Sequence, residues 1–196
     1  MKDLRILLLL LLAPLFCLTS CEESTEVNDY ANWEVRNKQY IDSIATVARA
    51  NAGGDWNVFL ADGLDPEKQW SNEYYVYCKV LEKGTGTKTP VYTDSVTINY
   101  KGRLMPTASS PQGFLFDSSY DGELDPQFDV PATFSLVGTV GGFCTALQHM
   151  VSGSRWVLYI PANLGYGNSA VSGIPAGSAL IFDVDLVSFT SEDDNE

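Results

Sequence analysis

The clearest structural pattern in the chain lies in residues 158–189, which run Leu158-Tyr-Ile-Pro-Ala-Asn-Leu-Gly-Tyr-Gly167 and, after a Ser/Gly/Pro loop, Ile174-Pro-Ala-Gly-Ser-Ala-Leu-Ile-Phe-Asp-Val-Asp-Leu-Val-Ser-Phe189. Residues 156–160 form an apolar run, and Pro161 ends it because proline cannot donate a hydrogen bond to a sheet. The glycines on either side of Tyr166 allow the backbone angles of a turn. We therefore expect Tyr166 to stand on a loop after a strand.

The second part of this stretch alternates between the two faces of a strand. Leu180, Phe182, Val184 and Leu186 would share one face, and Ile181, Asp183 and Asp185 the other. This period of two is typical of a half-buried β-strand. The first strand, the tyrosine on the loop and the aromatic strand can together line a pocket.

The same stretch closely resembles the C-terminal half of the FKBP-type peptidyl-prolyl isomerases. In that family a Tyr-Gly loop and an Ile-Pro segment overhang an apolar pocket, and a strand like Leu-Ile-Phe-Asp-Val-Asp-Leu closes it. The resemblance implies a pocket that holds a proline ring. It covers residues 73–189, because the upstream elements follow the order of the family.

Those upstream elements are predicted from their own patterns. We expect strands at residues 74–81, 95–104, 114–116 and 133–137, and a short helix at residues 143–150. Several antiparallel strands with one short helix indicate an α+β fold, in which a bent antiparallel β-sheet wraps around the helix. This FKBP-like domain is preceded by an N-terminal amphipathic helix.

Residues 1–20 are typical of a bacterial lipoprotein signal peptide. Lys2 and Arg5 precede an apolar core at residues 6–16, which is too short to span a bilayer comfortably. Leu-Thr-Ser-Cys21 resembles a lipobox, whose cysteine is acylated and becomes the mature N-terminus. We expect an extracytoplasmic protein, lipid-anchored through Cys21 to a bacterial membrane on the periplasmic side or at the cell surface. An ordinary cleaved signal peptide is the alternative.

Residues 21–72 are predicted to hold a tether, a helix at residues 30–52 and a loop linker at residues 55–72. The apolar stripe of the helix comprises Trp33, Tyr40, Ile41, Ile44, Val47 and Ala48. Asn28 or Asp29 can cap its start, and Gly53-Gly54 ends it. The stripe packs either on the chain's own domain, which we favour, or on a second copy in a homodimer through residues 30–52.

Residues 190–196 are predicted to be an acidic tail. Two cysteines, Cys78 and Cys144, remain in the predicted mature domain. Two cysteines are too few for a disulfide scaffold. We expect Cys78 and Cys144 each to act as a small buried hydrophobe. A Cys78–Cys144 bridge is the alternative.

The resemblance also carries the pocket residues of the family onto this chain. The motifs Asn-Tyr-Lys-Gly, Phe-Asp-Ser-Ser and Thr-Val-Gly-Gly-Phe, with the stretch quoted first, imply a site made of Tyr100, Phe116, Asp117, Val140, Phe143, Tyr166, Ile174 and Phe182. The chain departs from the family at two positions. Phe143, at the floor of the pocket, replaces the usual tryptophan, and Ala132 stands where many members carry an aromatic wall residue.

The activity implied by the resemblance is cis–trans isomerisation of X–Pro bonds, to assist the folding of exported proteins. Rotation crosses a barrier near ~20 kcal/mol because amide resonance must be broken. An apolar pocket favours the twisted amide over the planar one, which is differential binding. Val140 N–H and the Tyr166 hydroxyl would hold substrate carbonyls, and Asp117 would either orient Tyr100 or polarise the site, without transferring a proton. The alternative is a non-catalytic FKBP-like module that binds polypeptides in the same groove.

Composition and motifs argue against other classes of function. A formal net charge of −13 repels phosphate backbones, so we expect no nucleic-acid binding. The sequence has no Gly-x-Ser-x-Gly elbow, Walker loop or zinc-type spacing. The acidic residues of the loop at 120–131 lack a calcium-binding pattern, and the single histidine, His149, is expected to be exposed. We expect no cofactor and no metal, and proline-containing unfolded or exported polypeptides as partners.

Overall fold

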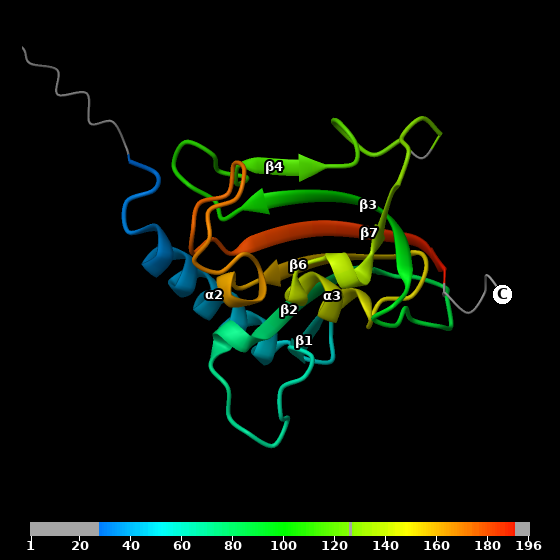
Figure 1. The fold of residues 1–196 in the computed structure, drawn as a ribbon, viewed down its shortest axis with the longest axis horizontal. Helices are drawn as coiled ribbons and strands as arrows, with labels where there is room; N and C mark the ends of the chain where they lie inside the picture. The colour runs from blue at the N-terminus through cyan, green and yellow to red at the C-terminus, as the bar shows by residue number, and fades with distance from the viewer. Residues whose placement is uncertain (1–27, 126, 191–196) are drawn as a thin grey trace, which may run out of the picture.

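The computed structural model describes residues 28–125 and 127–190 (Figure 1). Within them, seven antiparallel strands form one sheet in the order β1-β2-β6-β7-β3-β4, and β5 also pairs with β3. The strands are β1 (Trp56–Leu60), β2 (Tyr75–Lys83), β3 (Ser95–Leu104), β4 (Leu115–Ser118), β5 (Ala132–Ser135), β6 (Ser154–Ile160) and β7 (Leu180–Thr190). The helices are α2 (Trp33–Ala50) and α3 (Gly141–Leu147), with single 3₁₀ turns η1 (Asn72–Tyr74), η2 (Leu136–Gly138) and η3 (Ala162–Leu164).

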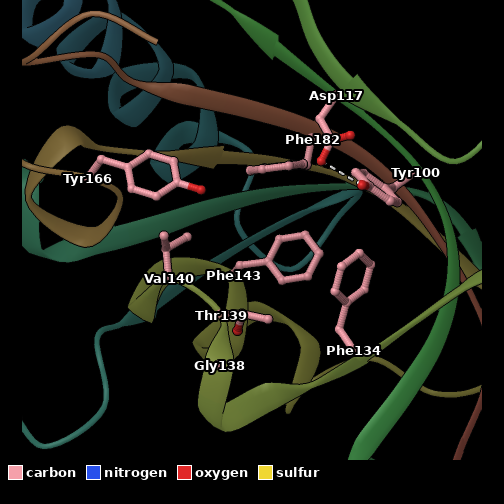
Figure 2. Close-up of a pocket in the computed structure, with 9 residues that line it drawn as sticks. All are labelled: Tyr100, Asp117, Phe134, Gly138, Thr139, Val140, Phe143, Tyr166 and Phe182. Atoms are coloured by element: carbon pink, nitrogen blue, oxygen red, sulfur yellow. Dashed lines mark hydrogen bonds between the residues drawn. The ribbon is translucent and has the colours of Figure 1, made fainter. Parts of the chain in front are cut away.

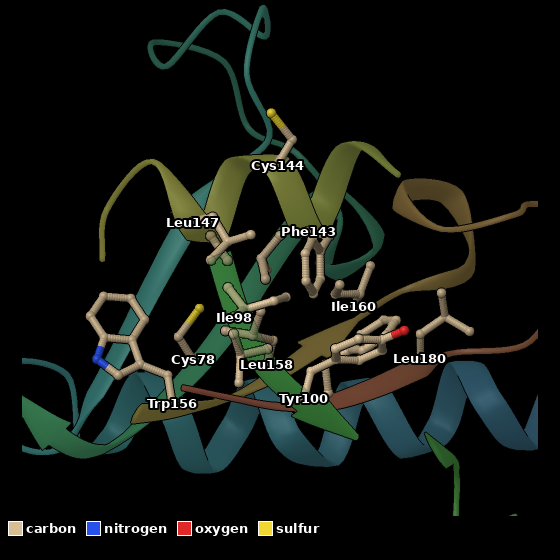
Figure 3. Packing of buried hydrophobic residues seen from close by; sticks show 14 of the residues in the cluster. Cys78, Ile98, Tyr100, Phe143, Cys144, Leu147, Trp156, Leu158, Ile160 and Leu180 are labelled. Carbon is tan, nitrogen blue, oxygen red and sulfur yellow. The ribbon is translucent and has the colours of Figure 1, made fainter. Parts of the chain in front are cut away.

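The centre of the sheet is the long ladder between β3 and β7. It runs from the pair Ser95–Thr190 to the pair Leu104–Leu180. The alternation expected along β7 is confirmed, since its four apolar side chains at 180, 182, 184 and 186 are 0–8% exposed. They face α3, which lies across one face of the sheet (Figures 1 and 3). The predicted α+β fold, with a sheet wrapped around one short helix, is therefore confirmed.

The predicted elements of this domain are present, and all but the strand at 95–104 have shifted ends. The strands expected at residues 74–81, 95–104 and 114–116 are β2, β3 and β4, and the helix expected at 143–150 is α3. The strand expected at 133–137 is β5, but its last two predicted residues lie in η2. Because η2 turns the chain from β5 toward α3, the strand ends at Ser135, although the apolar residues Leu136 and Val137 follow it.

The core around α3 is apolar, and both Cys78 and Cys144 belong to it as buried free thiols. Phe143 and Leu147 of α3 pack against sheet residues such as Leu158 (Figure 3). Cys78 points from β2 into this core, whereas Cys144 lies on the far side of α3. The alternative of a Cys78–Cys144 bridge is wrong, and both residues act as buried small hydrophobes.

Helix α2 packs on the opposite face of the sheet. Ile41, Ala45 and Ala48 are at most 2% exposed and form a second core with Trp56 and Tyr77. The amphipathic helix is thus confirmed, and its apolar face is buried against the chain's own domain. The buried face differs from the predicted stripe at three positions: Val47 is exposed, whereas Asn37 and Ala45 are buried. Asn37 is buried where it accepts a hydrogen bond from Ala179 N–H, and Ala45 is buried in the second core.

Two local expectations are wrong. Residues 55–72 are not wholly a loop, because Trp56–Leu60 form the edge strand β1 and pair with β2 over five residues. Nor does the side chain of Asn28 or Asp29 cap α2. Asn32 occupies the N-cap in the left-handed conformation with no side-chain cap bond, while Asn28 Oδ1 accepts a hydrogen bond from Tyr30 N–H. This local bond closes a turn before the helix, so α2 begins later than the predicted capping residues Asn28 and Asp29 indicate.

The predicted signal peptide, Cys21 and most of the acidic tail lie outside the described residues. Within the described part, no helix combines the length and the apolar character needed to cross a membrane.

Candidate functional site

A cavity of about 260 Å³ opens between the α3 side of the sheet and the loop before β7 (Figure 2). Its lining residues come from five parts of the chain. They are Tyr100, Asp117, Phe134, Gly138, Thr139, Val140, Phe143, Tyr166 and Phe182. The site therefore forms only when segments more than 80 residues apart in the sequence are brought together.

Glycine at position 102 allows two aromatic side chains to approach the sheet behind the cavity. A Cβ atom at Gly102 would lie 2.6 Å from the ring of Phe116 and 2.8 Å from the ring of Phe182. Contacts this short do not occur for real side chains, so any larger residue would displace both rings. Phe116 and Phe182 meet edge to face with ring centroids 5.5 Å apart. Phe116 thus supports the wall of the cavity from behind.

The floor and walls are aromatic rings in mutual contact. Phe143 is 5% exposed and meets Phe182 edge to face at a centroid separation of 4.9 Å. Phe134 meets Tyr100 edge to face at 5.5 Å. Figure 2 shows the Phe143 ring between these neighbours, at the base of the cavity. Edge-to-face contacts of this kind fix ring orientation, so the walls have a defined shape.

One hydrogen bond joins two predicted site residues, as expected. The Tyr100 hydroxyl donates to Asp117 Oδ2 over 2.6 Å. Burial raises the pKa of Tyr100 well above its usual range, and the hydrogen bond to Asp117 and its negative charge raise it further. Tyr100 therefore stays protonated at physiological pH and serves as a fixed donor.

Two residues that line the cavity, Val140 and Tyr166, carry hydrogen-bond donors. Val140 precedes α3 in an extended conformation, and its N–H has no hydrogen-bond acceptor among the residues described. Tyr166 is 39% exposed on the loop after η3, and its hydroxyl points into the space between the walls (Figure 2).

The structure brings six of the eight predicted site residues to the cavity surface. The six are Tyr100, Asp117, Val140, Phe143, Tyr166 and Phe182. Phe116 stands behind Phe182, and Ile174 is 5% exposed in the loop before β7, where it bridges to Val171. Neither lines the cavity.

Three lining residues were not predicted from the sequence, namely Phe134, Gly138 and Thr139. Phe134 shares a strand face with Ala132, since the two are two residues apart on β5. The wall therefore has an aromatic ring although Ala132 does not provide it. The alternation of residues 132–135 is the signal that could have identified Phe134.

The arrangement suits binding of an apolar group with two or three polar contacts. In the described ranges, no three His, Cys, Asp or Glu side chains come together as metal ligands. His149 lies outside the cavity, exposed as predicted, with one ring face stacked on Phe59 at 3.9 Å between centroids. The chemistry available in the cavity is therefore desolvation, shape and hydrogen bonding.

Comparison with known proteins gives concordant matches. The family described as FKBP-type peptidyl-prolyl cis-trans isomerase matches residues 86–187. The peptidyl-prolyl cis-trans isomerase Mip of Coxiella burnetii is 40% identical over 111 residues, which are 56% of this chain and 43% of that protein. The outer membrane protein MIP of Legionella longbeachae is 37% identical over 111 residues, 56% of this chain and 42% of that protein. This chain thus spans less than half the length of these relatives.

The fold matches solved structures as well. The crystal structure of FkpA from Escherichia coli aligns with a TM-score of 0.58 and 30% identity, over 83% of this chain and 61% of that one. A peptidyl-prolyl cis-trans isomerase from Pseudomonas syringae pv. tomato aligns with a TM-score of 0.53 and 27% identity, over 79% and 96% of the two chains.

Proposed function

We propose that this chain, which belongs to the FKBP-type peptidyl-prolyl cis-trans isomerase family, catalyses cis–trans isomerisation of X–Pro bonds in exported polypeptides. The observation that carries the proposal is the aromatic cavity with its Tyr100–Asp117 hydrogen bond. Its volume of about 260 Å³ lies below the roughly 300–1,000 Å³ of pockets for drug-sized ligands. A five-membered proline ring fits such a space better than a cofactor does.

The reaction on this interpretation needs no acid or base. The planar amide is stabilised by resonance and by water on its carbonyl oxygen, and the barrier to rotation is about 18–20 kcal/mol. Phe143 and Phe182 exclude water around the ring, while Val140 N–H and the Tyr166 hydroxyl hold neighbouring carbonyls. Binding the twisted amide more tightly than the planar one lowers the barrier. Tyr100, held by Asp117, shapes the wall without giving up its proton.

A direct test is NMR exchange spectroscopy on a proline-containing peptide. Without catalysis, exchange takes tens to hundreds of seconds at 25 °C, so acceleration is easily seen. Tyr166→Ala should lower kcat/KM with little loss of stability, because Tyr166 is 39% exposed. Tyr92→Ala, at an exposed tyrosine outside the cavity, is the matched control and should retain wild-type activity. Uncatalysed exchange with the wild-type protein, together with retained binding of unfolded chains, would favour the alternative of a non-catalytic binding module.

Selectivity for the residue before proline follows from the walls and the charge of the chain. A carboxylate there would meet an apolar wall and a protein of formal net charge −13. Bulky hydrophobic residues should therefore give a higher kcat/KM than glutamate in otherwise identical peptides. Because salt screens the long-range repulsion, part of this difference in kcat/KM should disappear at high ionic strength. A difference that does not depend on salt would mean that the apolar wall alone causes the selectivity.

We also propose that the protein works outside the cytoplasm, anchored by lipid on Cys21. The support is the leader at residues 1–20 and the similarity to a protein named outer membrane protein MIP. Mass spectrometry of membrane-extracted protein should find a diacylglyceryl group on Cys21. Cys21→Ser should release the protein from the membrane fraction, and an unmodified mature chain beginning at another residue would contradict the proposal.

A further inference from the structure

We propose that helix α2 positions the loop carrying Tyr166 and Ile174, through Trp33 and Asn37, and so sets the affinity of the cavity for its substrate. The inference rests on the isomerase function proposed above and deepens it. Neither Trp33 nor Asn37 lines the cavity, so both would be positioning residues. Figure 1 shows the loop between β6 and β7, in orange, next to the N-terminal half of α2.

The first connection runs from Trp33 to the Ile-Pro segment. Trp33 Nε1–H donates to Ser178 Oγ over 2.8 Å, and the Ser178 hydroxyl donates to the carbonyl oxygen of Pro175 over 2.6 Å. Trp33 is 7% exposed and Ser178 is 3% exposed. Water has little access to compete for these bonds, so they fix the position of Pro175, which directly follows Ile174.

The second connection explains the polar residue buried within the packed face of α2. Asn37 is 2% exposed, and its Oδ1 accepts the backbone N–H of Ala179 over 2.9 Å. Its Nδ2 donates to the carbonyl of Trp33 over 2.8 Å, which fixes the orientation of the amide. Ala179 is fully buried, so its N–H would otherwise lack a partner, which is costly. Asn37 therefore holds the end of the loop where β7 begins.

The third connection carries the contact to Tyr166. Gly177 lies against Glu34 so closely that a Cβ at position 177 would be 3.0 Å from two Glu34 side-chain atoms, and its φ is +72°. Gly177 N–H donates to the carbonyl of Gly167 over 2.9 Å, which ties the two limbs of the loop together. Because Gly167 is the neighbour of Tyr166, a shift of the loop against α2 would move the Tyr166 side chain.

This geometry predicts a particular kinetic effect. If the loop leaves α2 for part of the time, the binding-competent fraction falls and the apparent dissociation constant rises in inverse proportion. At saturating substrate, binding returns the loop to its competent position, so kcat is retained. Loosening the α2 contact should therefore raise KM and leave kcat close to that of the wild type.

The test uses substitutions that remove single hydrogen bonds. Trp33→Phe keeps an aromatic ring and removes the N–H, and Ser178→Ala removes the acceptor hydroxyl. Ser178→Thr keeps a hydroxyl and should restore wild-type behaviour. Ser43→Ala is the control on the exposed side of α2, where Ser43 bonds only to the carbonyl of Tyr40.

We expect Trp33→Phe and Ser178→Ala to raise KM about fivefold, as for a competent fraction reduced to about one fifth. Amide hydrogen exchange should accelerate at Gly177 and remain unchanged at Val184 in the core of β7. Wild-type KM and wild-type exchange at Gly177 in both variants would overturn the inference. Faster exchange at Val184 and Gly177 alike, with KM unchanged, would also overturn it, because α2 would then only stabilise the fold.

The outcome can be separated from that of the proposed function. If the wild-type protein does not catalyse isomerisation, the proposed function fails. Exchange at Gly177 and NMR titration with a proline-containing peptide still measure loop position and affinity. Weaker peptide binding in Ser178→Ala than in Ser178→Thr would support the positioning role, and equal binding would refute it.

Discussion

Replacing Tyr100 with phenylalanine removes one hydrogen bond from the cavity and leaves its aromatic packing in place. The hydroxyl donates to Asp117 over 2.6 Å. The ring lies 5.5 Å from Phe134 and 6.3 Å from Phe182, measured between centroids. These ring contacts do not involve the hydroxyl, so the substitution isolates its contribution.

The expected magnitude follows from the surroundings of the bond. A hydrogen bond to a charged acceptor contributes about 1.5–3 kcal/mol to stability. Asp117 is an exposed residue, so water can replace the hydroxyl, and we expect a loss of about 1 kcal/mol. That loss corresponds to a fall in Tm of about 2–4 °C for a chain of this size. If all of it is felt in the transition state, kcat/KM falls about fivefold.

A matched control separates loss of stability from loss of function. Tyr77 also donates its hydroxyl, to the carbonyl of Asn72 over 3.0 Å, but it packs with α2 on the other face of the sheet. Tyr77→Phe should lower Tm by a similar amount and leave kcat/KM unchanged. Thermal unfolding and NMR exchange on both variants decide the matter. Unchanged kcat/KM in Tyr100→Phe, or an equal fall in Tyr77→Phe, would show that the Tyr100 hydroxyl does not act in the transition state.

Three further predictions concern the floor and two titrating groups. Phe143→Trp should leave kcat/KM unchanged or raise it, because a larger ring extends the apolar floor, and a clear fall would contradict this. Burial raises the pKa of Tyr40 from 10.0 to about 12, with a smaller contribution from Tyr159. The neutral phenol is thus favoured in the folded state. The urea concentration at the unfolding midpoint should therefore stay constant below pH 10 and fall as the pH rises from about 10 toward 12, and this fall should be smaller in Tyr40→Phe. Burial lowers the pKa of His149 below 6.5, although the charge of Asp62 opposes it. Because one face of the His149 ring stacks on Phe59, NMR titration should give a pKa below 6.5 that rises in Phe59→Ala.

The sequence predicts the central strands well because one face of each is fully buried. Val96, Ile98 and Tyr100 alternate with more polar residues along β3, and the predicted bounds of 95–104 match the structure. The edge strand β1 was missed because it has five residues between turn-rich segments and no clear alternation. Its stability comes from pairing with β2, which the local sequence does not reveal.

For the site, sequence order shows which residues come close but not which of them reach the cavity surface. Phe116 and Phe182 both pack against Gly102, yet only Phe182 lines the cavity. That distinction depends on how the two rings pack against Gly102 and against each other, which the sequence does not reveal. Phe134 was not predicted, because the resemblance to the family places the aromatic wall residue at position 132, where this chain has alanine.

The least predictable feature is the connection between α2 and the cavity loop, and its chemistry explains why. An asparagine within an amphipathic helix normally indicates an exposed side, and Asn37 lies outside the most apolar stripe of the sequence. Its side chain is nevertheless buried, because its Oδ1 accepts a hydrogen bond from Ala179 N–H. The local sequence does not indicate this partner, which lies 142 residues away. A buried amide is retained only when both of its ends are satisfied, and Asn37 meets this condition through Trp33 and Ala179. Helix α2 therefore contacts the cavity loop through a residue outside the range 86–187 that matches the family model, and this contact is the basis of the positioning role that we propose for it.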